Sequence, residues 1–415
     1  MMSTQAPGAV SARPTVADIP PSCVHEVFRA VTEYEAAHGV PALGLHVGEP
    51  AFRPPAAVAD AVLAAVRDGR TGYTTAEGLL ELRSALVDKL RTRNGHDTDT
   101  DLVFVTPGST QGLMTLMHAV AAPDAEILLP SVHWPIHLQQ SLLTGLRPVF
   151  YPLDDRMRPD VDALARIGGD RPRTLLLNSP NNPTGAVCGE RHLLALLDLA
   201  HSRGWTVISD EAYEDFAYDE EHISLARLER NVSPHQRRVF SAFSFSKGYG
   251  MTGWRLGYVT APNERHAAAV RTVQEASIMC PPEPVQLAGI AALGRPECLA
   301  ANKAMVRHTR DTALRPLLDT GLLARLPEGG WYALLDCRTT GLDADTFAAR
   351  LLAEHGVALA AGPGFALRPL VDAAGQVRTV DEEPQARGLL RLAFCGETET
   401  VREGVSRVAR FAATL

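Results

Sequence analysis

Residues 241–259 read SAFSFSKGYGMTGWRLGYV, and they contain Lys247, one of only three lysines in a chain of 415 residues. Arginine supplies nearly all the other positive charge. A guanidinium keeps its proton in proteins, whereas a partly desolvated lysine can become a neutral amine nucleophile. The other two lysines, Lys89 and Lys303, lie in stretches typical of amphipathic helices, and we expect them to be ordinary. Lys247, set among serines, glycines and aromatics, is therefore the candidate reactive amine.

The composition sets the class of protein in which this lysine acts. Apolar residues make up 46% of the chain and charged residues 21%, which is typical of a well-packed globular protein. The formal net charge of −8 argues against a nucleic-acid-binding surface or an anionic-membrane partner. The six cysteines form no CxxC pair, as expected of reduced thiols rather than a disulfide framework or a zinc site.

Targeting signals are not evident in the sequence. No apolar run reaches transmembrane length, and residues 1–22 lack the basic region and apolar core of a secretory signal. We expect that N-terminal stretch to be a loose tail or an arm that orders against another part of the molecule. A cytoplasmic location follows as the expectation.

Helical stretches alternate with short apolar runs between about residues 56 and 295. This alternation predicts a mostly parallel sheet with helices on both faces, whose chemistry collects beyond the carboxyl ends of the strands. After residue 295 the pattern indicates a small α+β domain. We therefore divide the chain into an N-terminal arm that helps complete the small domain (1–50), a large domain (51–295) and a small C-terminal domain (296–415).

Two predicted strand ends carry polar side chains suited to surround a reactive lysine. The apolar run TVIS ends in Asp210, with Tyr213 three residues later, and a carboxylate there is unfavourable unless it meets a cation. For an isolated aspartate, a helix N-cap or an ordinary ion pair would explain it equally well. The run LLLNSPNNPTG ends another strand in asparagine and proline turns.

A third strand end predicts an anion site. TPGSTQGL places Gly108, Ser109 and Thr110 between a strand and a helix, where N–H groups and hydroxyls can hold a phosphate. Serine and threonine caps are common, so this motif alone is weak. The chain contains neither GxxxxGK[ST] nor a GxGxxG opening a βαβ unit, so the nucleotide devices are not used.

Together these motifs resemble the fold-type I pyridoxal-phosphate-dependent aminotransferases of class I/II, in the aspartate aminotransferase superfamily. The run S-x-S-K-x-x-x-M-T-G-W-R-x-G-Y is specific to that group. The resemblance covers nearly the whole chain beyond the first thirty residues, in family order. Its other motifs are LHVGEP (45–50), GYTTAEGLLELR (72–83), TPGSTQGL, HWPIH, NSPNNPTG, SDEAYE and LLRLAF. It implies a mostly parallel central sheet flanked by helices plus a smaller α+β domain, the cofactor pyridoxal 5'-phosphate, and a homodimer with shared active sites.

The resemblance also implies roles around the cofactor ring. Lys247 would form the internal aldimine and then serve as general base and acid. Asp210 would pair with the protonated pyridine nitrogen. Tyr213 and Asn182 would hydrogen-bond the phenolic oxygen, and Trp134 would stack on the ring.

Further implied roles concern the phosphate and the substrate. Ser109, Thr110 and Ser244 would hold the phosphate with the Gly108 turn and Arg255, and Tyr73 would reach it from a neighbouring subunit. Arg391 would bind the substrate α-carboxylate as a fork, with the Gly48 backbone, Asn182 and Trp134 beside it.

Two features invite a metal assignment that we reject. His133 and His137 stand at i and i+4, but no third ligand is evident, and His137 is expected to support Asp210 instead. The acidic run SDEAYEDFAYDEE (209–221) is expected to be a solvated loop and helix start after Asp210.

The expected reaction is transamination of an amino acid with a 2-oxo acid as acceptor. The alternative is a pyridoxal-phosphate lyase, cyclase or replacement enzyme that performs β- or γ-elimination chemistry, for example on a sulfonium amino acid, because the same residues serve both. An aminotransferase-like transcription regulator is disfavoured, since the 44 residues before LHVGEP are too few for a DNA-binding domain.

Two departures from the family pattern bear on the substrate. Glu275 precedes Pro281-Pro282 near the place where dicarboxylate-specific members carry a basic residue from the neighbouring subunit. We hypothesise that aspartate is disfavoured and a cationic substrate permitted; a solvated helix face is the alternative. Residues 366–388, just ahead of Arg391, are longer and more charged than the family needs, and we interpret them as a lid or specificity element rather than a disordered insertion.

Overall fold

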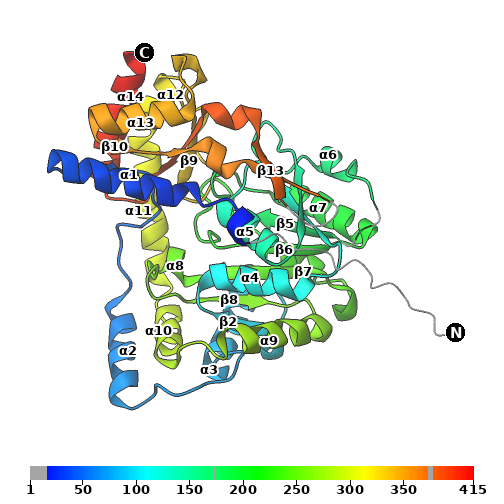
Figure 1. The fold of residues 1–415 in the computed structure, drawn as a ribbon. Helices are drawn as coiled ribbons and strands as arrows, with labels where there is room; N and C mark the ends of the chain where they lie inside the picture. Colours follow the sequence, from blue (N-terminus) through cyan, green and yellow to red (C-terminus); the bar gives the residue numbers. More distant parts are fainter. Residues whose placement is uncertain (1–15, 170, 172, 373–376) are drawn as a thin grey trace.

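The computed structural model describes residues 16–169, 171, 173–372 and 377–415. Its centre is a seven-stranded sheet in the order β2-β8-β7-β6-β5-β3-β4 (Figure 1). Neighbouring strands are parallel except β8, which is antiparallel to both β7 and β2. The strands are β2 (Val103–Thr106), β3 (Glu126–Pro130), β4 (Arg147–Tyr151), β5 (Arg173–Asn178), β6 (Thr206–Asp210), β7 (Val239–Ser244) and β8 (Gly257–Thr260).

The strands are short apolar runs because both faces of the sheet are covered. Successive side chains of a strand point to opposite faces, so neighbours enter different cores. Ile127 of β3 and Ile208 of β6 enter one core, whereas Leu128 and Val207 enter the other. The predicted mostly parallel sheet is confirmed.

Helices cover both faces and one edge of this sheet (Figure 1). One face is covered by α4 (Gly108–Val120), α5 (Pro135–Leu143) and α9 (Glu264–Ile278), and the other by α6 (Val161–Ala165) and α7 (Glu190–Arg203). A third core joins β2 and β8 to α2 (Ala56–Arg67), α3 (Leu80–Lys89) and α10 (Glu283–Leu293).

A smaller sheet domain is built from both ends of the chain. The parallel pair β1 (Leu43–Gly44) and β10 (Val357–Ala358) lies beside a three-stranded antiparallel sheet of β11 (Ala360–Ala361), β14 (Leu389–Ala393) and β9 (Tyr332–Asp336). The short run VALAA (357–361) is thus divided between two sheets. Its helices are α1 (Cys23–His38), α11 (Glu297–Ala313), α12 (Arg315–Asp319), α13 (Ala344–His355) and α14 (Thr398–Ala413).

Much of the segment 366–388 is ordered, contrary to a disordered insertion. It forms the antiparallel hairpin β12 (Leu367–Val371) and β13 (Val377–Glu382), followed by the 3₁₀ turn η8 (Pro384–Gly388). Residues 373–376, and residues 1–15 of the expected N-terminal arm, lie outside the described part. The hairpin reaches the large sheet, because Arg147 of β4 donates to the carbonyl oxygens of Val371 and Asp372.

Membrane-spanning length is not reached by any helix in the described part of the chain.

Candidate active site

A cavity of about 210 Å³ lies at the carboxyl edge of the large sheet. The strand register explains its composition, since Asn178 of β5 stands beside Asp210 of β6, and Ser244 of β7 stands beside Gly257 at the start of β8. Ten of the sequence-predicted site residues line this cavity: Gly48, Ser109, Thr110, Trp134, Asn182, Asp210, Tyr213, Ser244, Lys247 and Arg255.

Asp210 is buried at the end of β6 and bonded on three sides. Its Oδ2 lies 2.9 Å from His137 Nε2, and its Oδ1 accepts the backbone N–H of Ala212 at 3.2 Å. Asn178 Nδ2 donates to the Asp210 carbonyl oxygen at 3.0 Å. The structure therefore brings His137 to Asp210, as the sequence analysis expected, and these bonds fix the direction in which the carboxylate faces the cavity.

Lys247 lies in the single-turn helix α8 (Phe245–Gly248), which directly follows β7. Its Nζ lies 4.9 Å from the ring centre of Trp331 and 5.3 Å from that of Tyr213. Asn302 of α11 donates its Nδ2 to the carbonyl oxygen of Gly248 at 2.8 Å, which holds this turn from behind. The amine thus lies beside two aromatic rings, which lower its exposure to water.

The N-terminus of α4 forms a tight cup with the turn before β8. Gly108 has φ +78°, and a Cβ there would lie 2.5 Å from Arg255 Nη2. A Cβ at Gly257 would likewise lie 2.5 Å from the backbone nitrogen of Ser109. Because only glycine fits at both places, backbone N–H groups and a guanidinium converge on one small space, as an anion site needs.

Arg391 of β14 is buried at 2% exposure beside the cavity, although it is not among the lining residues. Its Nη1 donates to Asn182 Oδ1 at 3.0 Å and its Nη2 to the His46 carbonyl oxygen at 2.8 Å. The guanidinium lies between two rings, with centres 4.2 Å (Tyr332) and 4.5 Å (Phe365) away. These contacts fix its plane, which a two-pronged carboxylate contact requires.

Neighbouring ionisable groups are shifted toward their neutral forms. Burial, with Arg391 adding to it, lowers the pKa of His46 to about 4. Burial, reinforced by Tyr332, raises the pKa of Tyr213 well above its usual range. At neutral pH Tyr213 is therefore a hydroxyl donor facing the cavity.

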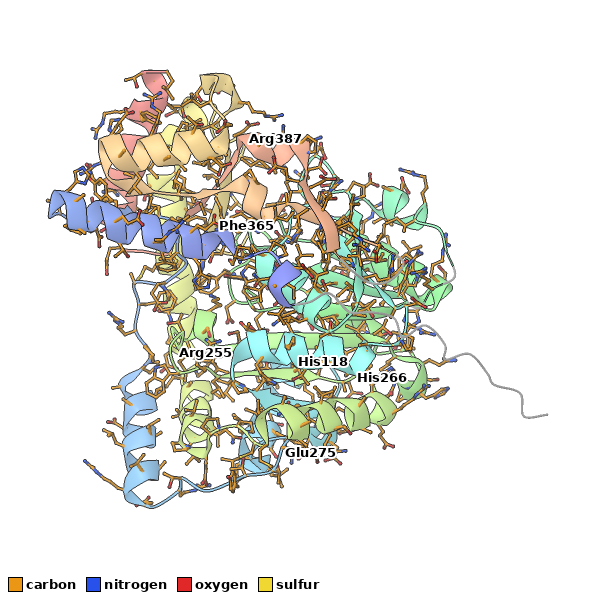
Figure 2. All side chains as sticks on the ribbon, in the orientation of Figure 1. His118, Arg255, His266, Glu275, Phe365 and Arg387 are labelled. Atoms are coloured by element: carbon orange, nitrogen blue, oxygen red, sulfur yellow. The ribbon has the colours of Figure 1, made fainter. Side chains whose placement is uncertain are left out.

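Two predicted residues lie apart from the cavity in this protomer. Tyr73 is 90% exposed and does not line it. Glu275 is on the exposed face of α9, well separated in the view from Arg255 and Phe365 (Figure 2). The single protomer therefore does not bring either of them to the site.

His133 is fully buried, and its Nδ1 lies 3.1 Å from the Pro130 carbonyl oxygen. Burial, reinforced by His137, lowers the pKa of His133 to about 3. No group of three or more His, Cys, Asp or Glu side chains in the described ranges is arranged to hold a metal ion.

Several lining residues escaped the sequence analysis: Glu49, Asn178, Ala212, Ser246, Thr252 and Tyr332. All of them except Tyr332 lie within quoted motifs and could have been found there. Tyr332 starts β9, and only the fold brings it to Arg391. A second cavity of about 480 Å³, between α1 and α13, is lined by none of the predicted site residues.

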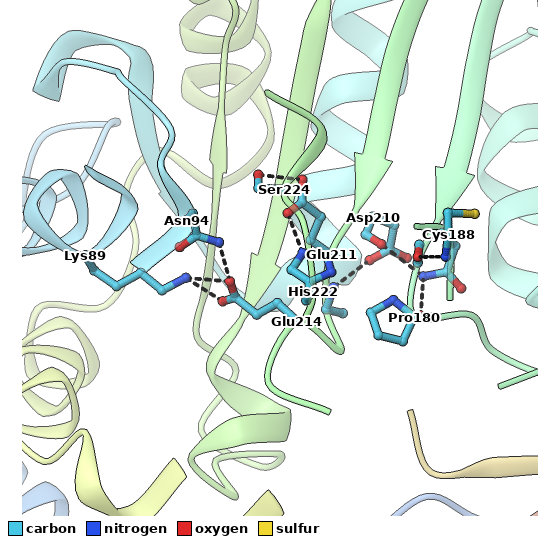
Figure 3. A network of polar contacts seen from close by, with 12 residues as sticks. Lys89, Asn94, Pro180, Cys188, Asp210, Glu211, Glu214, His222 and Ser224 are labelled. Atoms are coloured by element: carbon cyan, nitrogen blue, oxygen red, sulfur yellow. Dashed lines mark hydrogen bonds and ion pairs between the residues drawn. The ribbon is translucent and has the colours of Figure 1, made fainter. Parts of the chain in front are cut away.

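The expectation of a solvated acidic run after Asp210 holds for its last residues, Asp219, Glu220 and Glu221, which are exposed, but it is wrong for the residues before them. The view of Lys89 as ordinary is also wrong. Glu211 is 1% exposed, and the side chains of Glu214 and Asp215 are 11% and 10% exposed. Lys89, itself buried, pairs with Glu214 (Figure 3). The sequence shows that Glu214 is acidic, but it does not show that α3 places Lys89 beside it, so this ion pair could not be predicted.

The comparisons with known proteins agree with this geometry. The family model Aminotransferase class I and II matches residues 40–408. The aspartate/prephenate aminotransferase of Thermus thermophilus is 34% identical over 90% of this chain and 91% of its own. The arginine–pyruvate transaminase of Pseudomonas aeruginosa is 31% identical over 94% of each.

Solved structures show the same likeness. The Thermus thermophilus aspartate aminotransferase with maleate superposes with a TM-score of 0.84, at 31% identity over 95% of this chain and 98% of that one. The alanine aminotransferase from Pyrococcus furiosus gives a TM-score of 0.86, at 27% identity over 97% and 99%.

Proposed function

The chain belongs to the aminotransferase class I and II family and is a pyridoxal-phosphate-dependent aminotransferase; from that premise we propose that the cavity at the carboxyl edge of the large sheet is its active site and Lys247 its reactive amine. The observation that carries the assignment is the convergence of Lys247, Asp210 and the α4 cup on one cavity of about 210 Å³.

The residues fit pyridoxal phosphate at each of its polar groups. The cup of Gly108, Ser109 and Arg255 suits the phosphate, because the glycines at 108 and 257 let the Arg255 guanidinium and the Ser109 N–H lie close together, where a Cβ would collide with them. Asp210, oriented by His137, suits a protonated ring nitrogen. Asn182 Oδ1 accepts a hydrogen bond from Arg391, so the Asn182 Nδ2 group is left as a donor for the phenolic oxygen, beside Tyr213.

Bound there, pyridoxal phosphate supplies an electron-poor ring that stabilises negative charge at the substrate α-carbon. Asp210 would keep a proton on the ring nitrogen, and Tyr213 would donate to the phenolic oxygen. Arg391 would hold the substrate α-carboxylate as a fork. Lys247 Nζ would then take the proton from the substrate α-carbon and return it during transfer.

For the amino donor we propose an α-amino acid with a neutral or cationic side chain, and a 2-oxo acid as acceptor. Lys247 and Arg255 are the cations among the described lining residues, and both already have roles. A second carboxylate on the substrate would therefore lack a partner within this protomer. The relative named arginine–pyruvate transaminase supports this choice, whereas the relatives named aspartate aminotransferase support the opposite one.

The test is the half-reaction of the purified, reconstituted enzyme with single amino donors. We expect conversion of the cofactor to its amine form to be faster, per molar donor, with arginine or ornithine than with aspartate. Efficient aspartate turnover contradicts the donor proposal, and a lack of any amine form points to elimination chemistry instead.

We also propose a homodimer in which Tyr73 completes the partner's phosphate cup. Exposed apolar side chains on α2 and the segments near it support an interface there: Leu63, Val66, Tyr73, Leu80 and Met279. Mixed dimers of Lys247→Ala and Tyr73→Ala chains test it, since one of their two sites would be intact. Activity above that of either parent is expected; its absence contradicts shared sites.

The six cysteines are free thiols. This supports, as part of the proposal, a reducing cytoplasmic setting.

A further inference from the structure

The segment that follows β6 presents two opposite faces. Asp210 and Tyr213 line the cavity, whereas Glu211 and Glu214 bond to buried groups on the other side (Figure 3). This second face belongs to no step of the reaction described above. It raises the question of what a row of buried carboxylates does directly behind the cofactor site.

Glu214 is the most completely bonded of these carboxylates. Lys89 Nζ lies 2.5 Å from its Oε1 and 2.7 Å from its Oε2, and Asn94 Nδ2 donates to Oε2 at 2.7 Å. Lys89 ends α3, and Asn94 ends the π-helical turn η2 (Leu90–Asn94) that follows. Figure 3 shows the Lys89 side chain, from the end of α3, and the Asn94 side chain, from the end of η2, both reaching Glu214.

Lys89 is itself held in one place. Its side chain is 8% exposed, its Nζ donates to Tyr258 Oη at 3.1 Å, and it lies 4.8 Å from the ring centre of Phe243. Phe243 belongs to β7, which leads into Lys247. Burial raises the pKa of Glu214, but the Lys89 ammonium, the Asn94 amide and His222 together outweigh it and lower that pKa overall. Glu214 is therefore a carboxylate at neutral pH.

Two further contacts connect this face to the reactive lysine and to the sheet. Asp215 accepts Arg93 Nη2 at 2.7 Å, and its Oδ2 occupies the space that a Cβ on Gly248 would take. Glu211 accepts Ser224 Oγ at 3.1 Å and lies 2.9 Å from His222 Nε2. Asp215 thus lies against the turn that carries Lys247, and the carboxylates of Glu211, Glu214 and Asp215 all belong to the segment that carries Tyr213.

We propose that Lys89, acting through Glu214, is a positioning residue that sets the Tyr213 hydroxyl against the phenolic oxygen of the cofactor. Tyr213 and Glu214 are adjacent in the chain, so a displaced Glu214 side chain turns the peptide that carries Tyr213. The proposal rests on the role assigned to Tyr213 in the proposed function. A purely structural role for the pair would affect stability alone.

The experiment separates these roles with a double variant, Lys89→Met/Glu214→Met. Removing one partner leaves an uncompensated buried charge, whereas replacing both with apolar side chains often restores stability. Each variant is expressed, stripped of cofactor and titrated with pyridoxal phosphate. The melting temperature and the pH midpoint of the holoenzyme colour change are measured alongside. Lys303→Met, a half-buried lysine of α11, is the matched control.

We expect the double variant to melt near the wild type and yet bind pyridoxal phosphate about ten-fold more weakly, the loss of roughly one hydrogen bond to a charged group. Its colour change should shift to higher pH, as in Tyr213→Phe, because a donor to the phenolic oxygen stabilises the deprotonated form. A double variant with wild-type affinity and midpoint would overturn the proposal.

If the double variant does not fold, Asn94→Ala provides the second test, since it removes one donor to Glu214 and no charge. The same shifts, at smaller size, support the proposal, and unchanged values contradict it. A wild-type protein that binds no pyridoxal phosphate, or a Tyr213→Phe variant with an unchanged midpoint, would instead refute the proposed site.

Discussion

The two halves of the active site are assembled in different ways. The cofactor half is built from the ends of neighbouring strands, as Asn178, Asp210 and Ser244 show. The substrate half centres on Arg391, whose partners come from residues 46, 182, 332 and 365. Parallel strands deliver the first half together by topology, whereas the second exists only after the smaller sheets have packed against the large one.

This difference teaches where each half is vulnerable. A change in the cofactor half removes a chemical group but leaves the strands that hold its neighbours. A change in the substrate half alters a guanidinium that is held by four separate segments, so binding of the donor should suffer more than binding of the cofactor. The following predictions use that separation, from the largest expected effect to the smallest.

Lys247→Ala should break the cofactor half most completely. We expect kcat to fall by more than about 10⁴-fold, since the variant loses both the covalent attachment and the proton-transfer group. Pyridoxal phosphate should still bind, through Asp210 and the α4 cup, but without the imine absorbance. Steady-state kinetics and absorbance spectra measure both effects, with Lys303→Ala as the control. A variant retaining a tenth of wild-type kcat would rule out Lys247 as the reactive amine.

Arg391→Lys should damage the substrate half selectively. An ammonium cannot reproduce the planar fork, and a hydrogen bond to a charged group contributes about 1.5–3 kcal/mol. We therefore expect kcat/KM for the amino donor to fall by about 10²-fold, with a much smaller loss of affinity for pyridoxal phosphate, through Asn182. Arg387→Lys, at an exposed position paired with Glu382, is the control. Equal losses of donor and cofactor binding would show that the two halves are not separable.

The cofactor half was largely predictable from the sequence, and the reason is physical. Lys247, Asp210 and Ser109 each stand within a few residues of a strand end, so short motifs fix their surroundings. Arg391 could be named from the LLRLAF motif, but its contacts with Tyr332 and Phe365 depend on packing between segments far apart in the chain. The partners of Lys89 were missed for the same reason: its helical pattern shows an apolar face and says nothing of Glu214, 125 residues away.

Acid should unfold the protein partly through His46, behind Arg391. Burial and Arg391 lower its folded pKa to about 4 from 6.5, so below pH 6.5 the unfolded chain binds a proton that the folded one does not. Above pH 6.5 His46 does not lower the free energy of unfolding. Between pH 6.5 and 4, His46 lowers it by about 1.4 kcal/mol for each pH unit.

His46→Asn should remove the one extra proton that the unfolded chain binds at this position below pH 6.5. Urea unfolding at several pH values measures it, and the free energy of unfolding of the variant should fall less steeply between pH 6.5 and 4. His38→Asn, at an exposed position of α1, should leave the slope as in the wild type. Identical slopes for His46→Asn and the wild type would contradict the assignment of His46 as neutral.

The smallest expected effect concerns the hairpin of β12 and β13, which extends from the substrate half to β4. It begins two residues after Phe365, and Arg147 fixes it by bonds of 2.9 Å to the Asp372 oxygen and 3.2 Å to the Val371 oxygen. Phe365 in turn accepts the His133 N–H at 2.7 Å and lies against Arg391. We therefore expect the hairpin to restrict the motion of the Phe365 ring, which packs on the Arg391 guanidinium.

Arg147→Ala removes both bonds while leaving every cavity residue in place. Each such bond contributes about 1 kcal/mol net, and part of that stability should reach Phe365, so KM for the amino donor should rise by about 3- to 10-fold. The affinity for pyridoxal phosphate should stay within error of the wild type, and the exposed Arg166→Ala variant should change neither. Replacing residues 368–382 by a short glycine–serine turn should reproduce the rise in KM. If neither variant alters KM, the hairpin is a surface addition, and the substrate half is held by the smaller sheets alone.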